Sequence, residues 1–590
     1  MTRHRPLVFL LALTVVPFAS EEPRGEPRAP SSAVADTLVG LWKAQRWFGP
    51  EGRGPLVIER TGTTFSADMM GRRLPVAVER GELSFALPGG QGTFRGTLAE
   101  DGAIRGRWFP PPALAMGGHP TPLALFPDGP DRWTGEVVPF DDTFTMYLLV
   151  RQQPDGTLAA FLRNIERDWG ALLGVRRVVR EGNDLALLGQ PPWEAEEVEV
   201  SRGSYDPESD VIRLWFPSRG GTYDFRRDDE QSDFYPRGLR ADRYVYRPPL
   251  ARDDGWTTGT VEEVGIDRAG VERFVQQLVD MPMDTVDAPQ IHGLLIARHG
   301  KLVLEEYFHG EHRDRLHDTR SASKSVTATL IGAAIQAGMP IDLSTPVYEV
   351  MNGGSFPADL DPRKRAMTVE HLLTMSSGYY CNDSDPEAPG SEEVISNQTD
   401  EPDYYRYTLS VPMAFAPGDT AIYCSANTNL ALGALGRATG ESTLDIFDRL
   451  LGDPMMIERY GWGLDPAGNP YGGGSVQFLP RDFMKFGQLM LADGMWEGRR
   501  ILSHEFVERA SSPLYRIGER GYGLSWWGVD MPYGDGTVYT YSALGAGGQN
   551  LTVVPSLDLV IMAWGGSYGS RGWRYMQAEG VPGHILPAVR

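Results

Sequence analysis

Two patterns of hydrophobic and polar positions divide the chain near residue 237. Before that point, short runs alternate apolar and polar residues between turns rich in Gly, Asp and Pro, as in PLVIERTGTTFSA and TFRGTLAEDGAIRGRWF. A period of two places every second side chain on the same face of a β-strand. Residues 37–235 are therefore predicted to be all-β.

The β region also repeats internally. RGTLAEDGAIRGRWFPP from Arg95 matches RGSYDPESDVIRLWFPS from Arg202, which aligns Trp108 with Trp215. Two tandem antiparallel units are expected, at residues 37–128 and 129–235, either as two small barrels or as halves of one barrel or sandwich. Their tryptophans could bind a cell-wall glycan, but core positions in a spacer domain are the favoured interpretation.

The pattern after residue 257 is helical in its middle and β at both ends. Residues 236–257 form a Pro- and Arg-rich connector that we expect to lie along the surface. Asp267 then precedes apolar residues at helical spacing, HGLLIARHGKLVLEEYF predicts a hairpin turning at His299-Gly300, and three strands close the chain. Residues 258–590 are therefore predicted to form an α/β domain, an antiparallel sheet flanked by helices.

Charge and the N-terminus restrict where the protein acts. A net charge of −22 argues against a nucleic-acid partner or an anionic membrane surface, so a small-molecule or peptide-like substrate is expected. Residues 1–20 combine a basic start with a short apolar run from Leu7 to Val16, which is typical of a cleaved secretory signal, and residues 21–36 form a linker. A periplasmic or secreted protein is predicted, free of the membrane after cleavage.

The candidate chemistry begins with S-x-x-K at Ser321 and Lys324, at the start of an Ala-rich apolar run. On a helix, residues three apart lie on one face, so a neutral lysine can take the proton of the serine as the serine attacks a carbonyl. Only five of the 56 basic residues are lysines. Because arginine cannot be deprotonated in a protein, a rare lysine at this position favours a catalytic base.

Residues 258–590 resemble the serine β-lactamase and penicillin-binding-protein-like hydrolases, above all class C β-lactamase-related esterases and 6-aminohexanoate-dimer hydrolases. The resemblance is carried by the S-x-x-K motif, YFHG from Tyr307, TVEHLLTMSSG and RDFMKFGQL. It implies that Ser321 is the nucleophile and Lys324 its base. The second motif of the family falls on Tyr423 and Ser425, with Tyr423 as proton relay, although Asn427 can be aligned in place of Ser425.

The third motif of the family usually carries Lys or His before a glycine, on a strand beside the pocket. The matching segment here, ALGAGGQ from Ala543, has no basic residue. Such a cation normally holds a substrate carboxylate, so its loss makes β-lactam hydrolysis less favoured. Gly545 and Gly547 are still expected to border the substrate, and the backbone N–H groups of Ser321 and Ala546 can form an oxyanion hole.

The chain has two cysteines, Cys381 and Cys424, both downstream of the Ser321–Lys324 pair. A disulfide between them is favoured over two free buried thiols, and it would tie a pocket loop to the Tyr423 segment. No metal-binding spacing occurs and no cofactor is expected.

The predicted function is an exported serine hydrolase that cleaves an ester or amide through an acyl-enzyme. A D-alanyl peptidase or β-lactamase is the enzymatic alternative. A non-catalytic cell-wall glycan-binding protein is the alternative from another class. The sequence makes no prediction of the oligomeric state.

Overall fold

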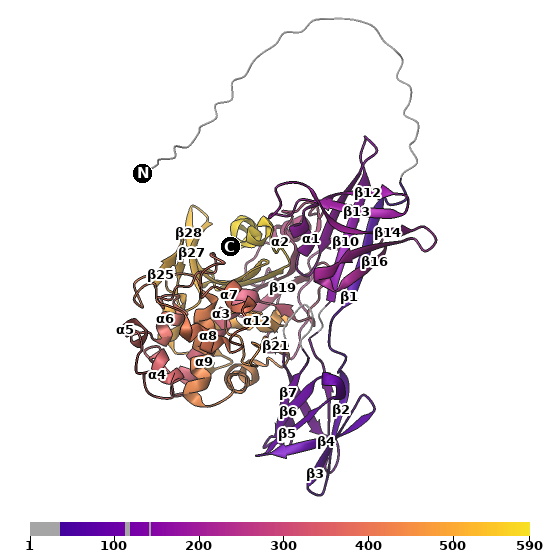
Figure 1. The fold of residues 1–590 in the computed structure, drawn as a ribbon. Coiled ribbons are helices and arrows are strands. Elements are labelled where there is room, and N and C mark those ends of the chain that lie inside the picture. The colour runs from indigo at the N-terminus through magenta and orange to yellow at the C-terminus, as the bar shows by residue number, and fades with distance from the viewer. Residues whose placement is uncertain (1–35, 112–118, 141–142) are drawn as a thin grey trace, which may run out of the picture.

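The computed structural model describes residues 36–111, 119–140 and 143–590. The predicted signal at residues 1–20 and nearly all of the predicted linker lie outside these ranges. Figure 1 shows two barrels on one side of a larger C-terminal domain. No helix in the described ranges has both the length and the apolar character needed to cross a bilayer.

The first barrel is a closed meander of eight antiparallel strands in chain order. The last strand pairs with the first, from Gly54↔Val137 to Glu59↔Arg132, and this pairing closes the barrel. Its interior is filled by alternate apolar side chains such as Leu56, Ile58 and Phe94. The strands are β2 (Gly54–Thr61), β3 (Thr64–Met69), β4 (Arg72–Glu79), β5 (Glu82–Ala86), β6 (Thr93–Leu98), β7 (Ile104–Phe109), β8 (Thr121–Pro127) and β9 (Arg132–Val137).

The second barrel takes its first strand from before the first barrel. β1 (Gly40–Trp47) pairs with both β10 and β16, so the first barrel is inserted between two paired strands of the second. The β region thus forms two barrels rather than halves of one. The predicted boundary at 128/129 falls before β9, inside the first barrel. The other strands are β10 (Thr143–Gln152), β11 (Leu158–Asn164), β12 (Val175–Glu181), β13 (Asp184–Gly189), β14 (Val198–Asp206), β15 (Val211–Phe216) and β16 (Gly221–Arg227), with α1 (Trp169–Leu173) between β11 and β12.

The two aligned tryptophans of the repeat do not share an environment. Trp108 on β7 is buried in the first barrel, whereas Trp215 on β15 is 56% exposed and its neighbour Phe216 is buried instead. The hairpin before β7 has five residues between Leu98 and Ile104, and the one before β15 has four between Asp206 and Val211. A change of one residue exchanges the two faces of a strand, so the core interpretation holds for Trp108 and is wrong for Trp215.

The C-terminal domain is built on one nine-stranded sheet in the order β17-β19-β18-β30-β29-β28-β27-β26-β25. β18 and β19 turn at His299 and Gly300, and β18 pairs with β30, so distant parts of the chain meet in one sheet as predicted. The strands are β17 (Thr257–Thr258), β18 (Ile291–Arg298), β19 (Lys301–Tyr307), β25 (Tyr515–Ile517), β26 (Arg520–Tyr522), β27 (Trp527–Tyr533), β28 (Gly536–Gly545), β29 (Gln549–Val554) and β30 (Leu559–Gly565).

Helices cover both faces of this sheet. Leu294 and Ile296 of β18 pack with α2 on one face, while Leu295 and Ala297 belong to the core that contains α3 on the other. The first face carries α2 (Arg268–Val279), the π-helix η7 (Met576–Ile585) and α14 (Leu586–Ala588). The second core contains residues of α3 (Ser323–Gln336), α4 (Val347–Met351), α6 (Val369–Leu373), α7 (Glu392–Asn397), α9 (Ser425–Thr439), α10 (Thr443–Phe447), α11 (Asp453–Met455), α12 (Pro480–Leu491) and α13 (His504–Ser511).

Short elements complete the domain. They are α5 (Pro362–Arg365), α8 (Tyr404–Ser410), the hairpin β23 (Met495–Trp496) and β24 (Arg499–Arg500), and the small sheet β20 (His317–Asp318), β22 (Val476–Phe478) and β21 (Tyr460–Trp462).

The connector at residues 236–257 is more than a surface linker. Tyr244 and Tyr246 are buried in the α2-side core, and their hydroxyls donate to the carboxylate of Glu306 and the carbonyl of Val303. On the opposite side of the domain, Arg107 of the first barrel forms ion pairs with two aspartates next to α10. These contacts join the barrels to the C-terminal domain.

Candidate active site

Ser321 and Lys324 lie on consecutive turns at the start of a buried helix. Ser321 is in the 3-10 turn η3 (Arg320–Ala322), and Lys324 is in the first turn of α3, which is buried from Ser323 to Ala334. The apolar run that follows the motif drives this burial. Lys324 Nζ is 3.0 Å from Ser321 Oγ, so the structure brings the predicted nucleophile and base into hydrogen-bond contact.

Lys324 is held in a site that favours its neutral form. Its side chain is 1% exposed, donates to the carbonyl of Gly473 and lies 5.0 Å from the ring centre of Tyr423. Burial lowers the pKa of Lys324, while the carboxylates of Glu392 and Asp383 partly oppose that shift. A lysine with a lowered pKa can accept the proton of Ser321.

Tyr423 closes the site on the other side of the lysine. Its ring stacks on Trp527 with 5.4 Å between ring centres, and it meets Tyr522 edge-on. Burial raises the pKa of Tyr423, while its hydrogen bond with Ser321 acts in the opposite direction. The phenol therefore stays protonated near neutral pH, which suits a proton relay rather than a phenolate base.

The structure distinguishes Ser425 from Asn427. Ser425 begins α9, and both its backbone N–H and its hydroxyl donate to Asp383 Oδ2 at 2.7 Å. The amide of Asn427 instead approaches Met375 Sδ at 3.7 Å. Ser425 is thus connected to the carboxylates around Lys324, and Asn427 is not.

Asp383 and Glu392 are site residues that the sequence patterns did not reveal. Asp383 N–H donates to Tyr423 O at 3.0 Å, Glu392 N–H donates to Asp383 Oδ1 at 3.0 Å, and Tyr471 OH donates to Glu392 Oε1 at 2.7 Å. In the sequence, the signal for these two carboxylates is the acid-rich stretch that follows Cys381. Because Asp383 and Glu392 follow Lys324 by 59 and 68 residues, no local pattern places these carboxylates near the lysine.

The predicted disulfide is present. Cys381 and Cys424 are bonded, with 5.7 Å between their Cα atoms, and both are buried. The bond joins the start of the acidic loop to the residue between Tyr423 and Ser425. It therefore ties the proton relay to the loop that carries Asp383.

The third-motif segment lies against the nucleophile. Gly545 ends β28, and a Cβ at this position would overlap Thr319 O and crowd Ala322 N, so only glycine lets the strand approach. Gly547 has φ of 85°, and a Cβ there would overlap the ring of Tyr568. Ala546, between them, is exposed. This close approach supports the predicted oxyanion donors at Ser321 and Ala546.

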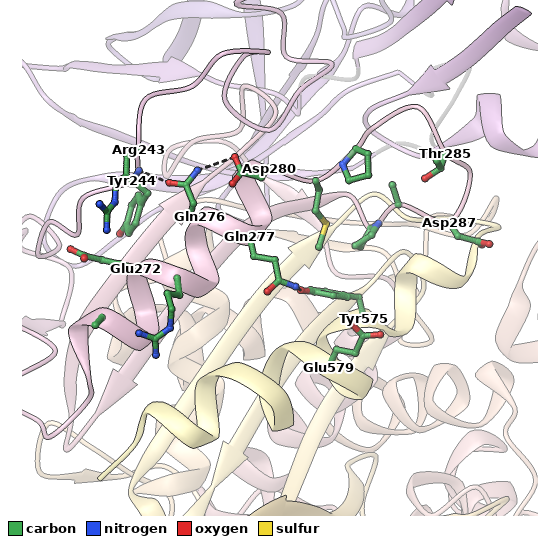
Figure 2. A pocket seen from close by; sticks show the side chains of 16 residues that line it. Arg243, Tyr244, Glu272, Gln276, Gln277, Asp280, Thr285, Asp287, Tyr575 and Glu579 are labelled. Atoms are coloured by element: carbon green, nitrogen blue, oxygen red, sulfur yellow. Dashed lines mark hydrogen bonds between the residues drawn. The ribbon is translucent and has the colours of Figure 1, made fainter.

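Of two cavities among the described residues, one lies near Ser321 and the other lies on the opposite face of the sheet. A small polar cavity of about 50 Å³ is lined by Asp318 and Tyr568 and, from the second barrel, by Thr143, Glu166 and Arg167. A larger cavity of about 980 Å³ lies on the α2 side of the sheet, where Gln277 bonds Tyr575 and Gln276 bonds Asp280 (Figure 2). The β region therefore reaches the neighbourhood of Ser321, and the larger cavity does not.

The helix-covered sheet and the serine at the head of its buried helix define a β-lactamase-type domain. The β-lactamase family model matches residues 271–565, half of the chain, and the protein belongs to this family of hydrolases. It is 26% identical over 289 residues to a 6-aminohexanoate-dimer hydrolase of Paenarthrobacter ureafaciens, covering 45% of this chain and 70% of that one.

Two solved structures of lower identity also match. The hydrolase EstCE1, described as having promiscuous acyltransferase activity, is 15% identical with a TM-score of 0.40, covering 52% of this chain and 95% of its own. A penicillin-binding protein homologue from Caulobacter crescentus is 14% identical with a TM-score of 0.41, covering 54% and 95%.

Proposed function

We propose that the protein is an exported serine hydrolase that cleaves an ester or amide through an acyl-enzyme on Ser321. The observation that carries the proposal is the 3.0 Å contact between Lys324 Nζ and Ser321 Oγ at a site that lowers the pKa of the lysine. A lone S-x-x-K motif has little specificity, but a buried base in contact with the serine hydroxyl is the arrangement that nucleophilic catalysis requires.

In the proposed acylation, neutral Lys324 accepts the proton of Ser321 as Oγ forms a bond to the carbonyl carbon. The negative charge that develops on the carbonyl oxygen is met by the backbone N–H groups of Ser321 and Ala546. The bond to the leaving group then breaks, and the proton passes from Lys324 through Tyr423 to the leaving oxygen or nitrogen. In deacylation water adds to the acyl carbon, gives its proton to the same network and releases the acid from Ser321.

Two features support an ester or amide over a β-lactam or muropeptide. A relative that is 26% identical over 289 residues is named a 6-aminohexanoate-dimer hydrolase, and this name supports an ordinary amide as the proposed target. The segment 543–549 carries no basic residue to hold a carboxylate. The glycan-binding alternative has one favourable observation, the exposed Trp215 on the second barrel, and it does not account for the buried Ser321–Lys324 pair.

The test compares wild type with Ser321→Ala and Lys324→Arg on 4-nitrophenyl butyrate, a linear amide dimer and a chromogenic β-lactam. We expect ester or amide turnover in wild type, a covalent adduct on Ser321 by mass spectrometry, and loss of both in Ser321→Ala. Lys324→Arg keeps a long basic side chain but cannot accept a proton, so turnover should fall by about 10³-fold or more. Absence of any covalent adduct on wild-type Ser321 would refute the proposed acyl-enzyme function. A turnover rate on the β-lactam above the rate on the ester would reverse the proposed substrate ranking.

A further inference from the structure

We propose, on the basis that Ser321 is the nucleophile of the proposed hydrolase, that Arg320 binds a carboxylate on the substrate. Arg320 would thereby supply the positive charge that the third motif lacks. The substrates would then be esters or amides that carry a carboxylate near the scissile bond, and the missing basic residue in the segment 543–549 would no longer count against a β-lactam.

The backbone of Arg320 is in an unusual conformation next to the nucleophile. Its φ is 49°, in the left-handed region that residues with a Cβ avoid. The conformation is fixed by the Arg320 N–H, which donates to Asp318 Oδ1 at 2.8 Å. Non-glycine residues held in this region are concentrated at functional sites, because the surrounding structure must compensate for the strain.

The Arg320 side chain and the third-motif segment contact the same tyrosine ring. The guanidinium carbon is 5.1 Å from the ring centre of Tyr568, and Nε donates to Tyr568 OH at 3.3 Å. The same ring occupies the space beside Gly547. The Tyr568 ring therefore holds an arginine from the nucleophile's own turn against the third-motif segment.

The guanidinium retains donors for a ligand. Nε lies 3.1 Å from Asp318 Oδ2, and among the described residues no hydrogen-bond acceptor is recorded for the two Nη groups. The Arg320 side chain is 31% exposed, so part of it is open to solvent. Two Nη groups in one plane match the two oxygens of a carboxylate.

The net charge of the protein is negative, but positively charged side chains lie around the proposed carboxylate site. With a net charge of −22 the long-range field repels anions, so carboxylate recognition needs a cation at the site. Asp318 offsets part of the Arg320 charge, but Arg167 of the second barrel acts electrostatically on both Asp318 and Tyr568. Glu392 also acts electrostatically on Arg320 and offsets a further part of its charge.

The experiment uses matched ester pairs that differ in one carboxylate. On the acyl side the pair is 4-nitrophenyl butyrate and 4-nitrophenyl hemisuccinate; on the leaving-group side it is phenyl acetate and 3-carboxyphenyl acetate. The variants are Arg320→Gln, Arg320→Lys and, as a matched control, Arg499→Gln, which changes an exposed arginine on the β24 hairpin.

We expect wild type to prefer the charged ester of at least one pair. In Arg320→Gln, the ratio of kcat/KM for the charged ester to kcat/KM for its neutral partner should fall about tenfold or more, as expected for a lost charge-assisted hydrogen bond. Arg320→Lys should keep part of the preference, and Arg499→Gln all of it. Added salt should weaken the preference.

An equal loss of kcat/KM on both esters in Arg320→Gln would overturn the proposal, because Arg320 would then only position the nucleophile. The absence of any preference in wild type would also overturn it. Calorimetric binding of the same esters to Ser321→Ala, with and without Arg320→Gln, gives a readout without turnover. Arg320-dependent binding of the charged ester without turnover in wild type would refute the hydrolase and support carboxylate binding; binding that does not depend on Arg320 would refute carboxylate binding.

Discussion

The disulfide between Cys381 and Cys424 offers a perturbation whose size follows from its place in the chain. The double variant Cys381→Ser/Cys424→Ser removes the bond, and the reductant dithiothreitol does the same in wild type. The bond closes a segment with a sequence separation of 43 residues. The chain-entropy relation for a loop of that length gives about 4 kcal/mol of stabilisation, through restriction of the unfolded chain.

The native contacts of the loop should survive removal of the bond. Asp383 and Ser425 would still be hydrogen bonded in the folded state, so the native structure keeps the loop in place while the unfolded chain gains freedom. We therefore expect the free energy of unfolding of the C-terminal domain to fall by about 2–4 kcal/mol, the range measured for natural and engineered disulfides.

The assay is urea unfolding followed by circular dichroism at 222 nm. Nearly all described helices lie in the C-terminal domain, since α1 is the one α-helix in the barrels among the described residues, so the helical signal reports on the domain that holds the disulfide. A loss below about 1 kcal/mol, or an unchanged midpoint in reduced wild type, would refute the reasoning that this bond restrains the unfolded chain.

Three further outcomes are expected. Glu392→Gln removes a carboxylate that raises the pKa of Lys324, so the acidic limb of the kcat/KM–pH profile should move to lower pH; a shift to higher pH would contradict the assignment of Lys324 as base. Tyr423→Phe should slow an alkyl ester or amide by about 10²-fold or more and a 4-nitrophenyl ester much less, because 4-nitrophenolate leaves without a proton; equal losses would argue against the relay. Arg107→Ala should destabilise the contact between the first barrel and α10 by about 1–2 kcal/mol, between exposed and buried ion pairs, and limited proteolysis that leaves the barrel as resistant as in wild type would exclude that contact.

Much of the C-terminal domain could be predicted because its signals are local. A hydroxyl and an amine three residues apart must share a helix face, and His299-Gly300 suits a tight hairpin because both residues adopt positive φ. The family resemblance then assigned Tyr423 and Ser425, and the structure brings both to the Ser321–Lys324 pair or its carboxylates.

The β region shows where local signals fail. Alternation predicted strands and the repeat predicted two units, but neither could show that β1 leaves the first unit and pairs in the second. Strand pairing depends on which edges meet after the chain has folded. The same limit explains Trp215, because one residue fewer in a hairpin exchanged the inner and outer faces of the strand.

The sequence by itself predicted the nucleophile, the base and the class of fold, and it showed that the third-motif segment has no basic residue. Only the tertiary structure decided that Asp383 and Glu392 act on Lys324, that Tyr568 fills the space beside Gly547, and that Arg320 lies on that ring. The physical reason is the distance along the chain between the residues that interact. Helix faces and turns are set by neighbours within a few residues, whereas the charge around a buried amine is set by side chains that meet only when the whole domain has packed.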